Sequence, residues 1–319
     1  MSEHIPVLVR EVIELLQPKP GHTLLDATLG HGGHAKAFLE AAGDDSTVIG
    51  IDADAAALAV ARQTLAQYGD RVQFQEGNFL TLPDVTVDAI LFDLGIGSHQ
   101  LSDEERGFSF TSSGPLSMKY GTHETLPPSR IAAINDLTQK LQRYPDADDL
   151  VNRLSPIALS EVIQMYGEER FAGVAANAIA GARPIVDAAT LAKLLQGALP
   201  KFYEKGRIHP ATRTFQALRL AVNRELEVLE RVLPQAVERL RTGGVIAVIS
   251  FHSLEDRIVK RYMRQEAKGC ICPPQQVVCI CGHTPRIEIL TKRPVIASEE
   301  EKQTNPRSRS AKLRAARKT

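Results

Sequence analysis

The sequence predicts an α/β fold in which a mostly parallel sheet carries an inserted helical domain. Short apolar segments alternate with helical ones as far as Asp93, as in a parallel sheet with helices on both faces. The alternation stops near Leu101, and residues 130–202 have helical apolar spacing without a good strand. A buried strand returns at residues 245–250, so we expect the chain to re-enter the sheet there.

The N-terminal elements are predicted from apolar spacing and from the residues that end each segment. Apolar residues in residues 6–17 recur at helical spacing, and Pro18 and Pro20 end that helix. Four strands are expected, each joined to the next by a helix or a turn, at residues 24–26, 47–52, 71–74 and 87–92. Helices are expected at residues 35–42 and 55–68.

The rest of the chain is predicted in the same way. Residues 102–128 are rich in glycine and proline and indicate turns, and the helices of residues 130–202 are separated by prolines. A long helix is expected over residues 211–241, with a bend at Pro234. After the strand at 245–250, Ser253 is a plausible N-cap of another helix, with Asp256 at its third position. A last strand is expected at 286–290.

A glycine-rich turn after the first strand indicates a nucleoside cofactor. Glycine lets backbone N–H groups approach a ligand, and Asp52, 22 residues after Gly30, has the spacing of a carboxylate that binds a ribose. The run from Gly30 to Ala35 also fits the NAD fingerprint, which leaves NAD open. Asp26 before the turn, Phe79 after the third strand and Asp93 after the fourth favour S-adenosylmethionine (SAM).

Asp93 and the residues after it are the candidate acceptor site. Asp93, Ser98 and Gln100 offer hydrogen bonds, and the intervening glycines leave room for a flat base. An exocyclic amine is a weak nucleophile because its lone pair is spread into the ring. A carboxylate that accepts its N–H bond would localise that lone pair toward a methyl donor. A simple turn or helix cap is the alternative role for Asp93.

The charge is balanced overall but is unevenly distributed. The chain has 38 basic and 38 acidic residues, yet residues 302–319 contain seven basic and no acidic ones. We expect a flexible basic tail that meets a polyanion, or a solvated tail that keeps the protein in solution. Candidate RNA-binding residues are Arg213, Arg219, Arg307 and Arg309, with ordinary ion pairs as the alternative for Arg213 and Arg219.

The four cysteines form a candidate metal site. Cys270, Cys272, Cys279 and Cys281 make two Cys-x-Cys pairs separated by six residues, close enough to collect a structural zinc ion. The spacing is one residue tighter than the usual Cys-x-x-Cys knuckle, so free thiols on a surface loop are the alternative. No secretory signal or apolar run of membrane-spanning length is evident, so we expect a cytoplasmic protein.

Several segments together resemble the bacterial small-subunit ribosomal RNA cytosine-N4 methyltransferases, the RsmH/MraW family. They occur in family order from the N-terminus to the C-terminus, which is far more specific than the glycine turn alone. The matching segments are Asp26–His34, Asp93–Gly95, Gln100–Leu101, Glu105–Phe110, Gly114–Leu116, Tyr166–Ala172, His209–Arg219, Ser250–Lys260 and Asn305–Ser310.

The resemblance implies a Rossmann-like SAM-dependent methyltransferase sheet with an inserted all-helical domain. The expected boundaries are 1–101 and 206–300 for the sheet domain, 102–205 for the helical substrate-recognition domain and 301–319 for the tail. The implied reaction is N4-methylation of a cytosine in the decoding region of 16S rRNA, with Asp93 and Ser98 as catalytic residues. The implied cofactor-binding residues are Gly32, Gly33, His34, Asp52, Phe79, Asp93 and Gln100. The small ribosomal subunit is the expected partner, no membrane is involved, and a homodimer stays open.

Some positions depart from the family pattern, mainly near the expected acceptor. Ser117 replaces an aspartate, Lys119 replaces an arginine, and Gly173–Ala176 lacks the usual arginines. Two alternatives therefore stay open: a SAM-binding protein that contacts RNA with weak or lost catalysis, and a methyltransferase with a different acceptor, including a small molecule.

Overall fold

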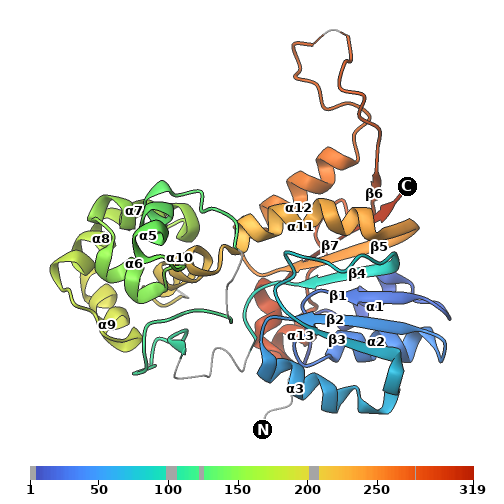
Figure 1. The fold of residues 1–319 in the computed structure, drawn as a ribbon, viewed down its shortest axis with the longest axis horizontal. Coiled ribbons are helices and arrows are strands. Elements are labelled where there is room, and N and C mark those ends of the chain that lie inside the picture. The colour runs from blue at the N-terminus through green and yellow to red at the C-terminus, as the bar shows by residue number, and fades with distance from the viewer. Residues whose placement is uncertain (1–4, 98–105, 122–125, 201–207, 277) are drawn as a thin grey trace. The chain divides into compact units, whose positions relative to one another are not determined.

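The computed structural model describes residues 5–97, 106–121, 126–200, 208–276 and 278–319 (Figure 1). The chain forms two compact units, residues 1–95 with 229–319 and residues 96–228. The expected boundaries at 102 and 205 differ from these, chiefly because helix α10 (Thr212–Asn223) belongs to the second unit. None of the helices in the described part of the chain is long and apolar enough to span a bilayer.

The first unit is built on a seven-stranded sheet with the order β3-β2-β1-β4-β5-β7-β6. The first five strands in this order run parallel, and β7 is antiparallel to β5 and β6. The strands are β1 (Thr23–Asp26), β2 (Thr47–Asp52), β3 (Val72–Glu76), β4 (Val87–Asp93), β5 (Leu240–Ser250), β6 (Ile287–Ile289) and β7 (Lys312–Lys318). Together with the helical insertion, this sheet confirms the predicted fold class.

Alternate residues along the central strands enter two different cores, one on each face of the sheet. On β4, Ala89 and Leu91 join one core, whereas Ile90 and Phe92 join the other. This period of two is the geometry of an extended strand, and it explains why the strands read as unbroken apolar runs. Burial of both faces fixes the strand register, because a slip of one residue would exchange the faces.

Helices cover both cores. The first core takes apolar side chains from α1 (Val9–Leu16), α2 (Gly33–Ala42) and α3 (Ala55–Thr64). The second takes them from α11 (Glu225–Arg239) and α12 (Ser253–Glu266). A short 3-10 helix, η1 (Ala66–Arg71), follows α3 and completes the stretch that was expected to be one helix to residue 68.

The C-terminal residues are part of the fold, and the prediction of a flexible basic tail is wrong. They form α13 (Glu299–Thr304), the 3-10 helix η4 (Pro306–Ser310) and β7, which lies between β5 and β6. Leu313, Ala315 and Ala316 are fully buried. The positive charges of β7 are neutralised locally, since Arg314 bonds Asp256 at 2.6 Å and Arg317 lies 3.4 Å from Glu288.

The second unit is helical. Its helices are α5 (Ala132–Leu141), α6 (Ala147–Arg153), α7 (Pro156–Gly167), α8 (Ala172–Gly181), α9 (Ala188–Ala198) and α10. A Cβ on Gly167 would lie 2.5 Å from the carbonyl oxygen of Arg213, so α7 and α10 pack closely only with glycine there. The expected helix over 211–241 is broken at Arg224, whose φ is 52°, and Pro234 lies inside α11.

Candidate functional site

Three aspartates gather at the carboxyl edge of the sheet. Asp26, Asp52 and Asp93 are the last residues of β1, β2 and β4. The three strands are parallel neighbours, with Asp26 in register with Gly50 on one side and Leu91 on the other, so their ends lie side by side. Open α/β sheets bind ligands at this edge. The three strand ends therefore bring these aspartates to one edge of the sheet.

The glycine turn between β1 and α2 is shaped by two glycines with left-handed backbone. Gly30 has φ 53° and Gly32 has φ 81°, and at these angles the backbone of a residue with a Cβ would be strained. Gly33 begins α2, and a Cβ there would lie 2.6 Å from the Pro6 ring. The turn thus leads directly into the first turn of α2, while within it the N–H of Gly32 donates to the Leu29 carbonyl at 2.8 Å.

Asp52 ties the turn to the neighbouring strand. Its Oδ2 accepts a hydrogen bond from the N–H of Gly30 at 2.7 Å, and its Oδ1 accepts one from Asp54 at 2.9 Å. A carboxylate oxygen can accept more than one hydrogen bond, and a carboxylate at this strand end is of the kind that binds ribose hydroxyls. Asp52 therefore has a structural role in addition to the predicted cofactor contact.

Phe79 lies on the loop after β3, which is attached to the same edge. Gly77 donates its N–H to the Asp52 carbonyl at 2.9 Å, and Asn78 Oδ1 accepts from the Leu80 N–H at 2.9 Å. The Phe79 ring meets Phe92 edge-on, with centroids 5.7 Å apart. This contact holds one edge of the ring and leaves it suited to packing against a planar group.

His34 connects the turn to Asp93. It is buried in the first turn of α2, and its Nε2 lies 2.9 Å from the Val7 carbonyl oxygen. A carbonyl can only accept, so Nε2 carries a proton. Burial lowers the pKa of His34, which favours the neutral ring with an unprotonated Nδ1. That Nδ1 lies 3.9 Å from Asp93 Oδ2. His34 thus lies against the candidate acceptor carboxylate.

Asp93 is held by its backbone, while one carboxylate oxygen lacks a partner. Its N–H donates to Thr28 Oγ1 at 2.6 Å. Its Oδ1 is buried and has no hydrogen-bond partner among the described residues. Burial, assisted by the carboxylate of Glu255, raises the pKa of Asp93 to about 7, although the Arg307 guanidinium opposes this shift. A buried acceptor without a donor is costly unless a ligand supplies one.

Asp26 is the second carboxyl group with a raised pKa at this edge. Only 1% of its surface is exposed, and burial raises its pKa to about 7 against the opposing effect of His34. Its Oδ1 accepts from the Thr28 N–H at 3.2 Å. Thr28 therefore links the two strand ends: its N–H donates to the Asp26 carboxyl group, and its hydroxyl accepts from the backbone N–H of Asp93.

Two residues near this edge have positions that the sequence did not predict. Arg307, expected in an RNA-binding tail, is half-buried in η4 and acts electrostatically on Asp93. His252, rather than Ser253, is the N-cap of α12, and Glu255 completes the capping box in place of Asp256. A signal was present for both: Arg307 falls in a segment that matches the family, and Glu255 stands three residues after His252.

The other candidate residues are distributed over both units. Ser98 and Gln100 lie outside the described residues. In the second unit, Arg213 donates to the Glu168 carbonyl at 3.1 Å, and Arg219 forms a two-pronged ion pair with Glu225 at 2.9 and 3.1 Å. Arg309 is exposed on η4. The pairing of Arg219 agrees with the ion-pair alternative for that residue.

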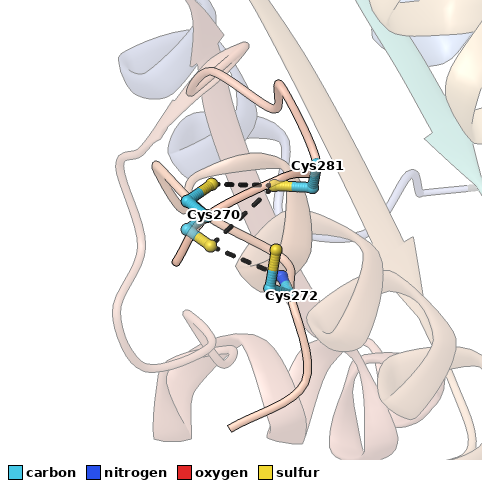
Figure 2. Close-up of side chains that lie close together, drawn as sticks. Cys270, Cys272 and Cys281 are labelled. Atoms are coloured by element: carbon cyan, nitrogen blue, oxygen red, sulfur yellow. Dashed lines mark hydrogen bonds between the residues drawn. The ribbon is translucent and has the colours of Figure 1, made fainter. Parts of the chain in front are cut away.

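The four cysteines converge on the loop between α12 and β6 (Figure 2). Their sulfurs all lie within 4.8 Å of one another, and the thiols are free. The N–H of Cys272 donates to Cys270 Sγ at 3.4 Å. Backbone N–H groups of Ile271 and His283 lower the pKa of Cys281 to about 6. The N–H of Cys272 lowers the pKa of Cys270, but contacts with the other three thiols outweigh it and raise that pKa to about 12.

Comparison with known proteins gives full-length matches. The sequence pattern of the MraW methylase family matches residues 1–319. The chain is 46% identical to "Ribosomal RNA small subunit methyltransferase H" of Trichlorobacter lovleyi, over 99% of this chain and 98% of that protein. It is 48% identical to the protein of that name from Geobacter sulfurreducens, over the same shares of each chain, and 48% identical to that of Solidesulfovibrio magneticus, over 98% and 94%.

Proposed function

The chain belongs to the MraW methylase family, and we propose that it transfers a methyl group from SAM to N4 of a cytosine in small-subunit ribosomal RNA. The full-length relatives are named as methyltransferases of that RNA, and their coverage supports the same substrate here. The small ribosomal subunit would be the partner, and the cytoplasm, where ribosomes work, the place of action. The observation that carries the proposal is the buried Oδ1 of Asp93, for which the described part of the chain supplies no hydrogen-bond donor.

The residues at the carboxyl edge fit SAM. The turn at Gly30–Gly33 leads into the first turn of α2, Asp52 ends the neighbouring strand with a carboxylate of the kind that binds ribose hydroxyls, and Phe79 offers a ring to the adenine. Gly32, Gly33, His34, Asp52 and Phe79 would hold the cofactor, together with Gln100 outside the described residues. SAM supplies a methyl group on a positively charged sulfur, which makes that carbon electrophilic.

Asp93 is the residue that would act on the acceptor. Its Oδ1 would accept an N–H bond from the exocyclic amine of cytosine and hold the nitrogen lone pair toward the methyl carbon. The N–C bond forms as the S–C bond breaks, and the nitrogen then carries an extra proton. A carboxylate with a pKa of about 7 can take that proton near neutral pH. Ser98 remains a candidate for a further hydrogen bond to the base.

Two of the departures from the family pattern, Ser117 and Lys119, make hydrogen bonds within the helical unit. Ser117 bonds α6 through its backbone, since its carbonyl accepts from Ala147 at 3.0 Å. Lys119 Nζ donates to the Tyr144 carbonyl at 3.0 Å.

Methyl incorporation tests the proposal. The purified full chain is incubated with methyl-labelled SAM and with small subunits from cells that lack this modification. We expect incorporation stoichiometric with the small subunits and none into large subunits, which serve as the matched control. Saturated SAM binding without transfer to any RNA would instead favour the non-catalytic alternative, and transfer to a small molecule would favour another acceptor.

A further inference from the structure

The cysteine loop, which joins α12 to β6, lies at the amino ends of the parallel strands, opposite the carboxyl ends where Asp93 lies. Helix α12 starts just after the carboxyl end of β5 and leads into the loop, and the loop then enters β6 at Ile287. Ile287 pairs with Lys318, whose neighbour Arg317 pairs with Val245 toward the amino end of the β5 ladder. The cluster therefore does not belong to the methyl-transfer site and needs an explanation of its own.

The loop has a closed base, but its described residues form no apolar core of their own. Arg286 donates its N–H to the Glu266 carbonyl at 2.9 Å, and this bond joins the two ends of the loop. Between them, the apolar side chains of Ile271, Val278 and Ile280 are exposed, the last two by 68% and 77%. Beyond its base, the loop projects from the rest of its unit (Figure 1). A segment this short without buried apolar surface needs another source of order.

The sulfurs have the separation that a tetrahedral metal requires. Four sulfurs about 2.3 Å from a zinc ion lie about 3.8 Å from one another at the corners of a tetrahedron. Cys281 Sγ lies 3.8 Å from Cys270 Sγ and 3.5 Å from Cys279 Sγ. The first pair follows α12 and the second precedes β6, so the four ligands come from both arms of the loop (Figure 2).

We propose that Cys270, Cys272, Cys279 and Cys281 bind one structural zinc ion that fastens the two arms of this loop together. Four thiolates leave no open coordination position, so the metal does no chemistry. Within the tight Cys-x-Cys pair, the N–H of Cys272 donates to Cys270 Sγ. Such a bond stabilises the negative charge of a thiolate that binds a metal. His283 is not one of the convergent ligand groups in the described part of the chain, although it follows Cys281 by two residues.

Metal analysis of the full chain, purified without chelators, tests this inference. We expect one zinc per chain by mass spectrometry, loss of that zinc in Cys270→Ser and Cys281→Ser, and its retention in His283→Ala, the matched control. Replacement by Co²⁺ should give the absorption of tetrahedral thiolate-bound cobalt. The wild-type cobalt spectrum keeps the inference testable even if a cysteine variant folds poorly.

The outcome is separable from the proposed function. Zinc loss should speed proteolytic cleavage within residues 268–284 while methyl transfer changes by less than about twofold, since the cluster lies away from the carboxyl edge. Folded wild-type protein without metal, or with iron in place of zinc, would overturn the assignment. Zinc that stays bound in both cysteine variants would also overturn it.

Discussion

Asp93 combines three properties that rarely meet in one side chain. It ends a buried strand, one of its oxygens has no donor among the residues that the structure describes, and its pKa is raised to about 7. His34 and Thr28 fix its surroundings: the imidazole lies 3.9 Å from Oδ2, and the Thr28 hydroxyl accepts from the Asp93 N–H. The sequence could identify Asp93 from its place after a strand. Its unpartnered oxygen and raised pKa depend on burial by residues far away in the chain.

Asp93→Asn tests whether Asp93 acts on the acceptor base or binds the cofactor. The amide keeps the size of the side chain but cannot take the proton or carry the charge. We expect turnover to fall by about 10²–10⁴ while the dissociation constant of SAM changes by less than about fivefold. Single-turnover methylation and calorimetry measure the two quantities. A parallel loss of SAM affinity would make Asp93 a cofactor ligand instead.

The pH profile provides the companion measurement. The carboxylate form is the active one, so single-turnover rates should rise as pH increases through the pKa of about 7 and level off above it. A rate independent of pH between about 5.5 and 8.5 would show that ionisation of Asp93 does not limit the step.

Asp26 should make the free protein less stable at high pH. Its pKa is about 7 in the fold but near 3.8 when unfolded, so the folded state binds the proton more tightly between these values. Stability therefore falls as pH rises from about 4 to 7 and is flat above. Asp26→Asn can still accept from Thr28 and does not titrate. We expect it to exceed wild type by roughly 2–4 kcal/mol at pH 8 in urea unfolding. Equal stability of the two proteins at pH 5 and pH 8 would contradict this.

At the scale of elements, strand β7 is the main feature that sequence reasoning missed. Residues 312–318 combine four basic residues with one leucine and two alanines, a composition with weak strand preference. They form a strand because β5 and β6 pair with it on both sides. Ion pairs of Arg314 with Asp256 and of Arg317 with Glu288 also balance part of its positive charge. Tertiary context of this kind is not visible in a local pattern. By contrast, β1, β2 and β4 were predictable because they are apolar runs that end in aspartate.

Leu313→Ala tests whether β7 stabilises the sheet. Leu313 is fully buried in the first core, so its truncation should cost about 2–4 kcal/mol of unfolding free energy. Arg317→Ala is the matched control on the same strand, since its side chain is 36% exposed, and it should change stability by less than about 0.5 kcal/mol. Denaturant unfolding compares them. If Leu313→Ala changed the unfolding free energy as little as Arg317→Ala, residues 312–318 would behave as a tail.

At the scale of the molecule, each unit has its own architecture. The change from strand–helix alternation to helices alone could be read from the sequence, but the boundaries could not. Helix α10 belongs to the helical unit because Gly167 lets α7 approach Arg213, a contact between residues 46 positions apart. The charge asymmetry suggested a free basic tail, whereas several of those charged side chains form ion pairs within the fold. Arg307 even contributes to the electrostatics of Asp93.

The most direct test of the account is the identity of the methylated nucleoside. Small subunits from cells that lack the modification are treated with SAM and the full chain, and their RNA is digested and mapped by mass spectrometry. The account predicts N4-methylcytidine at one cytosine of the decoding region, and none with Asp93→Asn. Methylation of another base, or of carbon 5 of cytosine, would contradict it, because no exocyclic amine would then face Asp93.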